Sequence, residues 1–170
     1  MPFPFHLLRG QFGGLVRRVE SGQILSSLNR GDVVVLTGDL GAGKTTLTRG
    51  LGEALGVRGA VTSPTFVIAR THPRANDLPP LVHVDAYRLS DPLELDDLDI
   101  DFAGSIVVVE WGKGMVEALA PERLEIDIDR PHGARSGSGL DDGVTDIERD
   151  VEPRKVTIRA VGDRWAGVAW

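Results

Sequence analysis

Residues 38–45 are the stretch that most restricts what this chain can fold into. They read Gly-Asp-Leu-Gly-Ala-Gly-Lys-Thr and fit G-x-x-x-x-G-K-[ST], the pattern of phosphate-binding loops. A β-branched apolar run at 32–37 precedes them, and apolar residues at helical spacing follow as far as Gly56. Strand, loop and helix in this order predict the nucleotide-binding unit of an α/β protein.

The residue types of this loop suit a ligand that carries several phosphates. Glycines at 38, 41 and 43 let the backbone approach a ligand closely, and the N–H groups of a helix N-terminus favour anions. Lys44 is expected to bind the β- and γ-phosphates, and the Thr45 hydroxyl is expected to ligate Mg²⁺. The predicted nucleotide-binding residues of the loop are Asp39, Leu40, Gly41, Ala42, Gly43, Lys44, Thr45 and Thr46.

Length and composition limit the class of protein. The chain has 170 residues, of which 41% are hydrophobic and 26% charged, as in one globular domain, so we expect a single domain over 1–170. There is no cysteine, which excludes disulfides and thiolate metal sites. No apolar run approaches the roughly 20 residues of a membrane span. The first residues also lack the pattern of a secretory signal, so we expect a cytoplasmic protein with no membrane partner.

The charge is unevenly distributed along the chain. Residues 1–60 hold seven Lys/Arg and four Asp/Glu, a net +3, whereas residues 61–170 hold twelve and twenty-one, a net −9. Such a balance does not fit a strong stand-alone nucleic-acid binder. Any role on a polynucleotide is therefore expected to need a partner that holds the polymer.

Apolar periodicity and turn residues predict the remaining elements. Residues 66–70 and 81–85 are expected to form a strand hairpin across a proline-rich loop, and 155–161 is expected to pair with 123–129. Residues 131–153 lose all pattern and are predicted to be a mobile insertion. The further expected elements are helices over 10–29, from Ser90-Asp91-Pro92 onward and over 113–120, and strands over 105–110 and 164–170.

Two carboxylates stand at the ends of predicted strands. Asp85 ends one strand, where it would face a nucleotide site or form a surface salt bridge with Arg88. Glu110 ends the apolar run 105–110 and has the form of a Walker B carboxylate, where Asp is usual. His83 is either a metal ligand or, as we favour, a packed strand histidine. The acidic cluster over 94–101 is interpreted as a solvated face rather than a metal site.

Four segments together resemble the TsaE (YjeE) family, small bacterial ATPases needed for threonylcarbamoyladenosine modification of tRNA. They are residues 38–46, 63–66 (SPTF), 83–89 (HVDAYRL) and 109–112 (VEWG), and the resemblance extends over about 31–129. It implies a P-loop NTPase of the α/β class, with a mostly parallel central sheet flanked by helices and with antiparallel additions. It also implies ATP and Mg²⁺ as cofactors.

The resemblance assigns roles to particular residues. It implies that Lys44 binds phosphates and that Thr45 and Glu110 hold Mg²⁺. Asp85 would be the polar group nearest the γ-phosphate, able to orient water or to coordinate the metal indirectly. The catalytic set implied is thus Lys44, Asp85 and Glu110.

The resemblance also places three regions around the nucleotide. Thr65 looks like part of the region facing it, and Trp111 is expected to pack near the site. A family position beside the adenine falls at 133–135, so Gly133 completes the predicted nucleotide-binding residues. The implied partners are TsaD and TsaB, which modify the adenosine beside the anticodon, with tRNA met indirectly through the complex.

We therefore expect an ATPase that is slow alone, is stimulated by its partners and drives a partner's cycle. The alternative is a small-molecule P-loop kinase, but it needs an acceptor pocket and usually an arginine-rich lid, and 131–153 is acidic with few arginines. A GTPase would need Asn-Lys-x-Asp, and neither Asn29 nor Asn76 begins that motif. No arginine finger is evident, although Arg88 is the nearest candidate within the chain.

Overall fold

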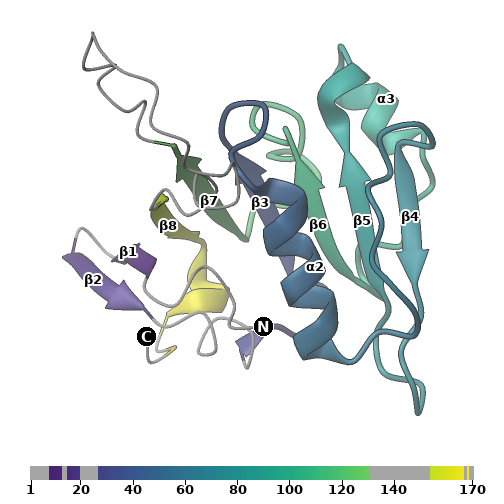
Figure 1. The fold of residues 1–170 in the computed structure, drawn as a ribbon, viewed down its shortest axis with the longest axis horizontal. Helices are drawn as coiled ribbons and strands as arrows, with labels where there is room; N and C mark the ends of the chain where they lie inside the picture. Colours follow the sequence, from purple (N-terminus) through teal and green to yellow (C-terminus); the bar gives the residue numbers. More distant parts are fainter. Residues whose placement is uncertain (1–7, 13–14, 20–26, 131–153, 167, 169–170) are drawn as a thin grey trace, which may run out of the picture.

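The computed structural model describes residues 8–12, 15–19, 27–130, 154–166 and 168, and within them shows an eight-stranded mixed sheet with one long helix against it (Figure 1). The strand order is β2-β1-β8-β7-β3-β6-β5-β4. The strands are β1 (Leu8–Phe12), β2 (Leu15–Val19), β3 (Val33–Thr37), β4 (Ala69–His72), β5 (Leu81–Asp85), β6 (Ile106–Glu110), β7 (Arg123–Asp129) and β8 (Lys155–Val161). The helices are α2 (Lys44–Leu55), η1 (Ala86–Arg88), α3 (Pro92–Asp96) and η2 (Asp163–Trp165).

The centre of the sheet is parallel and its additions are mostly antiparallel. β3 pairs in parallel with β6 and with β7, and β5 pairs in parallel with β6. β4 joins β5 as the predicted antiparallel hairpin, and β8 joins β7 as predicted. The predicted α/β fold, a mostly parallel central sheet with antiparallel additions, is confirmed.

Both faces of the central sheet are buried. Side chains alternate along a strand, so Val34 and Leu36 of β3 pack under Leu47 and Leu51 of α2, while Val33 faces the other side. That second face is covered by residues 86–102, which include η1 and α3, and by residues 111–120. Figure 1 shows α2 lying across the middle of the first face.

Glycines stand at both ends of the long helix α2. Gly43, in a left-handed conformation with φ 113°, precedes Lys44, the first helical residue. Gly56, with φ 68°, caps the other end, and its N–H bonds the carbonyls of Glu53 and Gly52. The phosphate-binding loop therefore leads directly into the N-terminus of a three-turn helix.

The helix predicted over 10–29 is wrong for its first half. Residues 10–12 and 15–19 belong to β1 and β2, which pair antiparallel from Leu8↔Val19 to Phe12↔Leu15, whereas Ser27 is helical. Glycines at 10, 13 and 14 disfavour a helix, and β1 also pairs in parallel with β8. Adding β1 gives the backbone of β8 a second partner that a helix would not provide.

Two further elements differ from the sequence expectations. Residues 113–120 form successive turns instead of a helix, because Gly114 takes the left-handed φ of 85° and Pro121 ends the segment. The predicted strand over 164–170 is replaced at its start by η2, whose Trp165 is buried in the core.

The predicted strand 66–70 begins only at Ala69. Residues 65–67 form a turn, and the Ile68 N–H donates to the Pro64 carbonyl at 2.7 Å while Ile68 has a φ of 67°. The predicted insertion over 131–153 lies outside the described residues.

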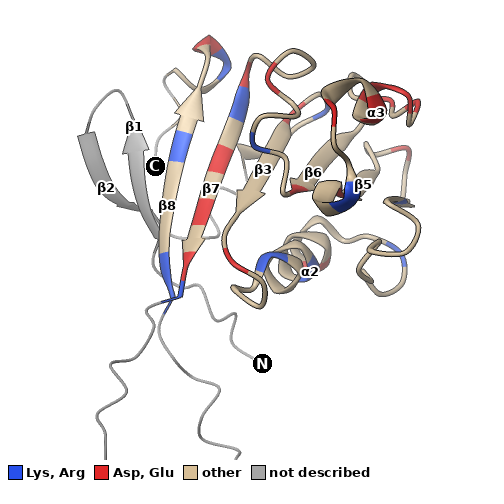
Figure 2. Ribbon diagram, turned by 90° about the horizontal axis from the view of Figure 1, so that it is seen from above, with Lys and Arg blue, Asp and Glu red and all other residues tan. Residues whose placement is uncertain are grey.

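The acidic segment after β5 lies in solvent. Asp91 caps α3 by accepting from the Leu93 N–H at 2.8 Å, as the Ser-Asp-Pro start predicts. The acidic residues around it, Glu94, Asp96, Asp97, Asp99 and Asp101, are all exposed. Figure 2 shows them as the red groups gathered around α3, which supports the interpretation as a solvated face. No helix in the described part of the chain has the length and apolarity needed to cross a bilayer.

A partly buried ion pair ties the C-terminal region to the start of β3. The Arg164 guanidinium donates from Nε to Asp32 Oδ1 at 2.9 Å and from Nη2 to Asp32 Oδ2 at 2.8 Å. The Asn29 N–H donates to the same carboxylate at 2.7 Å. Because Asp32 is buried, its negative charge would be unfavourable without these donors.

Arg164→Ala is expected to lower the free energy of unfolding by roughly 3 kcal/mol, the low end for breaking a buried pair, because Arg164 is 29% exposed. Urea unfolding measures it. The matched control is Arg159→Ala, because Arg159 is 51% exposed in its pair with Glu125 and is expected to cost about 1 kcal/mol or less. Equal losses in the two variants would contradict the role given to the Asp32 pair.

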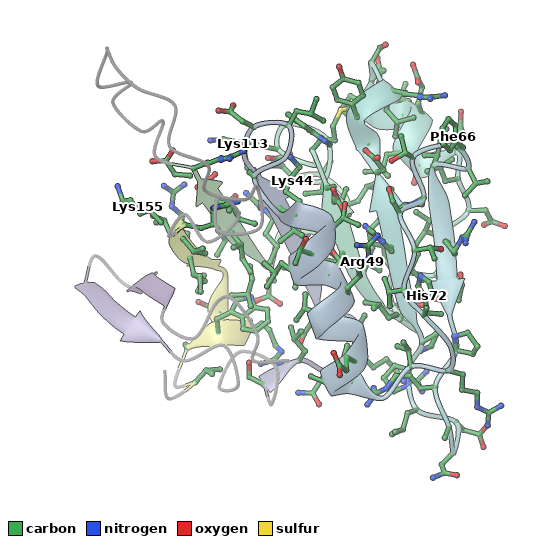
Figure 3. All side chains as sticks on the ribbon, viewed as in Figure 1. Lys44, Arg49, Phe66, His72, Lys113 and Lys155 are labelled. Atoms are coloured by element: carbon green, nitrogen blue, oxygen red, sulfur yellow. The ribbon has the colours of Figure 1, made fainter. Side chains whose placement is uncertain are left out.

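His72 gives the fold a dependence on pH. It is buried on β4, and its Nε2 has no hydrogen-bond partner among the described residues (Figure 3). Burial lowers the pKa of His72 below its usual 6.5, and the neighbouring His83 and Arg70 lower it further. As the pH falls below 6.5, the unfolded chain therefore binds a proton at this position before the folded chain does.

The contribution of neutral His72 to the free energy of unfolding is consequently expected to be fully present above the unfolded pKa and to be lost as the pH drops below it. Urea unfolding at pH 7.5 and at pH 5.5 measures this loss, in the parent and in His72→Leu. The free energy of unfolding of His72→Leu is expected to fall less between the two conditions than that of the parent. An unchanged pH dependence in His72→Leu would contradict this assignment.

Candidate functional site

A cavity opens where the carboxyl ends of β5 and β6 meet the phosphate-binding loop and the start of α2. Its volume is about 350 Å³. The residues that line it are Leu40, Gly41, Gly43, Lys44, Thr45, Thr46, Thr65, Asp85, Tyr87, Glu110 and Trp111. The cavity thus lies at the edge of a parallel sheet where α/β proteins bind ligands.

The loop geometry requires glycine. Gly38 has a φ of 146°, and a Cβ at this position would lie 2.3 Å from the Ile128 carbonyl oxygen. Gly41 has a φ of 77° but open space around it. The loop therefore packs on the end of β7 at Gly38 and leaves room for a ligand at Gly41, next to the positive end of α2.

Lys44 is held over the loop. Its Nζ donates to the Gly38 carbonyl at 2.6 Å and to the Asp39 carbonyl at 3.0 Å, and lies 3.7 Å from the centroid of the Trp111 ring. Burial lowers the pKa of Lys44, whereas the carboxylates of Glu110, Asp85 and Asp39 oppose that shift. Figure 3 shows Lys44 at the end of α2 nearest the loop.

The side chains of Glu110 and Thr45 meet in the wall of the cavity. The Thr45 hydroxyl donates to Glu110 Oε1 at 2.8 Å, although 65 residues separate them. Glu110 is only 4% exposed. A hydroxyl and a carboxylate, both hard oxygen donors, are the ligand types that Mg²⁺ takes, so the residues present fit this ion.

The same Glu110 oxygen has a second partner. His83 Nε2 lies 2.7 Å from Oε1, and the His83 side chain is fully buried on β5. His83 is therefore a packed strand histidine, as favoured from the sequence, but its contact with Glu110 was not predicted. The i, i+2 spacing of His83 and Asp85 was the available signal, since it places both on one face of β5.

The Asp85 carboxylate is held by hydrogen bonds to both of its oxygens. Oδ2 accepts from the Thr65 hydroxyl at 2.8 Å, and Oδ1 accepts from the Tyr87 N–H at 3.2 Å. Thr65 is itself 2.6 Å from the Ser63 hydroxyl. Arg88 instead lies over the ring of Phe66, at 5.7 Å from its centroid. Asp85 therefore faces the cavity rather than forming the alternative surface pair.

Two aromatic residues form one wall of the cavity. Trp111 follows β6 with a φ of 62°, and its N–H donates to the Leu36 carbonyl at 3.0 Å. Tyr87 lies 5.2 Å from Trp111 between ring centroids. Sequence reasoning placed Trp111 near the site but missed Tyr87, whose position just after a strand end was the signal.

Most of the predicted site residues converge here. Asp39 and Ala42 do not line the cavity, because Asp39 is exposed and contributes its carbonyl to Lys44, and Ala42 packs in the core. Gly133 lies outside the described residues. The predicted residues that do line the cavity are Leu40, Gly41, Gly43, Lys44, Thr45, Thr46, Thr65, Asp85, Glu110 and Trp111.

Comparison with known proteins agrees with this geometry. A family model described as "Threonylcarbamoyl adenosine biosynthesis protein TsaE" matches residues 17–136. A Streptomyces coelicolor protein named tRNA threonylcarbamoyladenosine biosynthesis protein TsaE is 56% identical over 151 residues, covering 86% of this chain and 93% of the relative. A Bacillus subtilis protein of the same name is 42% identical over 137 residues, covering 79% of this chain and 73% of the relative.

A solved structure shares the fold. The crystal structure of Bacillus subtilis YdiB superposes with a TM-score of 0.57 at 34% identity, covering 84% of this chain and 78% of that chain. The P-loop NTPase type of α/β fold, expected from the sequence, is thereby confirmed.

Proposed function

The chain belongs to the TsaE family of threonylcarbamoyl adenosine biosynthesis proteins, and we propose that it serves that pathway as an Mg²⁺-dependent ATPase. One observation carries this proposal. The Lys44 ammonium, the Thr45 hydroxyl and the Glu110 carboxylate converge on one cavity at the N-terminus of α2. That combination suits a nucleoside triphosphate with its cation.

The loop and Lys44 supply the phosphate-binding groups. Backbone N–H groups around Gly41 and Gly43 and the positive end of α2 favour the phosphates, and Lys44 adds a positive charge. Thr45 and Glu110 are the residues that would hold Mg²⁺, with Thr45 Oγ1 able to donate to Glu110 while it offers a lone pair. When bound, Mg²⁺ neutralises charge on the phosphates.

Asp85 is the residue proposed to orient the attacking water. Each of its oxygens accepts one hydrogen bond from the protein, and a carboxylate oxygen can accept a second. Thr65 and the Tyr87 N–H hold the carboxylate in place while it accepts from water in the cavity. Hydrolysis needs such positioning more than covalent help from the protein.

We propose TsaD and TsaB as the partners and tRNA as an indirect one. Among the described residues that line the cavity, Lys44 is the only cation, so a second positive charge has to come from elsewhere. A partner that supplies it would make hydrolysis slow in the isolated chain and faster in the complex. The net charge of −6 fits contact with tRNA through partners, and such a role places the chain in the cytoplasm.

The test is ATP turnover by the chain alone and with its TsaB–TsaD pair. A clear rise on addition supports the proposal. No rise, with turnover instead on an added small-molecule acceptor, would favour the alternative P-loop kinase.

Two substitutions test the site within the same assay. Glu110→Gln and Asp85→Asn are expected to keep the fold and to lower Mg²⁺-dependent turnover by roughly 100-fold or more, because each removes a charged group that positions a reacting species. The control is Glu94→Gln, an exposed carboxylate on α3 that is expected to turn over ATP at the parent rate. Parent-level turnover in either site variant would show that the role given to that residue is wrong.

A further inference from the structure

We propose that His83 is a positioning residue that fixes the Glu110 carboxylate for the cation. This inference rests on the proposed function, because it concerns the same site. His83 does not line the cavity, and it acts only through Glu110.

The sheet register brings the two residues together. β5 and β6 are parallel, with His83 opposite Val108 and Asp85 opposite Glu110. His83 and Glu110 are thus diagonal neighbours on one face, the face that α2 covers. The ring is fully buried, so its position is set by packing as well as by the hydrogen bond.

The chemistry of the contact defines the tautomer. An ionised carboxylate only accepts hydrogen bonds, so the 2.7 Å contact places the proton on His83 Nε2. The other nitrogen, Nδ1, is buried without a hydrogen-bond partner among the described residues. Nε2 is therefore the ring nitrogen that donates toward Glu110.

Two donors then hold one oxygen of Glu110. Oε1 accepts from His83 and from Thr45, so Oε2 remains the oxygen available to a cation. Glu carries one more rotatable bond than the Asp usual at this position, and an unanchored side chain would lose that freedom when it binds the ion. The hydrogen bond from His83 already restricts the rotation of the Glu110 side chain before a cation binds.

The competing interpretation is a histidine that merely fills the core. The two interpretations differ in what a substitution changes. Loss of a positioning donor weakens cation binding and leaves the phosphate loop intact, whereas a core defect weakens every property of the site together.

The experiment measures ADP affinity by calorimetry, in EDTA and across a Mg²⁺ titration, for the parent and for His83→Leu. In the variant, the Mg²⁺ affinity of the ADP complex is expected to fall about 10- to 100-fold, the usual cost of losing an outer-shell partner. ADP affinity in EDTA is expected to stay within about twofold, because Lys44 makes its hydrogen bonds to the loop carbonyls and His83 makes its hydrogen bond to Glu110.

Matched variants separate geometry from folding. His83→Gln places an amide N–H close to where Nε2 lies and is expected to restore most of the Mg²⁺ affinity, whereas His83→Asn is one methylene shorter and is expected not to. The control is His72→Leu, the other buried strand histidine on this face of the sheet, which is expected to bind Mg²⁺ like the parent. If His83→Leu does not fold, the Gln and Asn pair provides the same comparison.

Several outcomes would overturn the inference. It fails if His83→Leu (or His83→Asn) binds Mg²⁺ as the parent does, if ADP affinity in EDTA falls equally, or if Gln restores nothing. If the parent itself shows no Mg²⁺-enhanced ADP binding, the proposed function fails first and the inference with it.

Discussion

The buried carboxylate of Glu110 is the interaction on which the site depends. A carboxylate removed from water is unfavourable unless donors surround it. Here the donors come from two elements remote in sequence, Thr45 at the start of α2 and His83 on β5. Satisfying one charge therefore fixes the helix and two neighbouring strands relative to one another. The geometry that suits a cation is also the geometry that stabilises the fold.

Much of this arrangement could be predicted from the sequence, because local chemistry determines it. The loop from Gly38 to Thr45 and the apolar runs before Asp85 and Glu110 carry their own signals of turn, strand and burial. The strands β1 and β2 could not be predicted in this way, because β1 pairs with β8, which is remote in sequence. Likewise, the contact of His83 with Glu110 depends on the register of two strands, which no single strand encodes.

The ionisable groups fall into three sets. The cavity gathers Lys44 and buried carboxylates at one edge of the sheet, the exposed acidic residues lie around α3, and Asp32 pairs with Arg164 just before β3. Groups that must lose water are paired, and groups that cannot be paired remain exposed. The pair of Asp32 with Arg164 therefore contributes to stability apart from the site, whereas the contacts of Glu110 serve both the fold and the site.

The first glycine of the phosphate-binding loop has an evolutionary consequence. Gly38 is required because the Ile128 carbonyl occupies the space of a side chain, whereas Gly41 has open space beside it. Selection for folding alone would thus retain Gly38 most strongly, whereas at Gly41 only the left-handed φ of 77° disfavours a side chain. In a descendant that had lost its nucleotide, Gly41 would therefore change before Gly38. The order of decay along such a loop would record which of its glycines serve the fold and which serve the ligand.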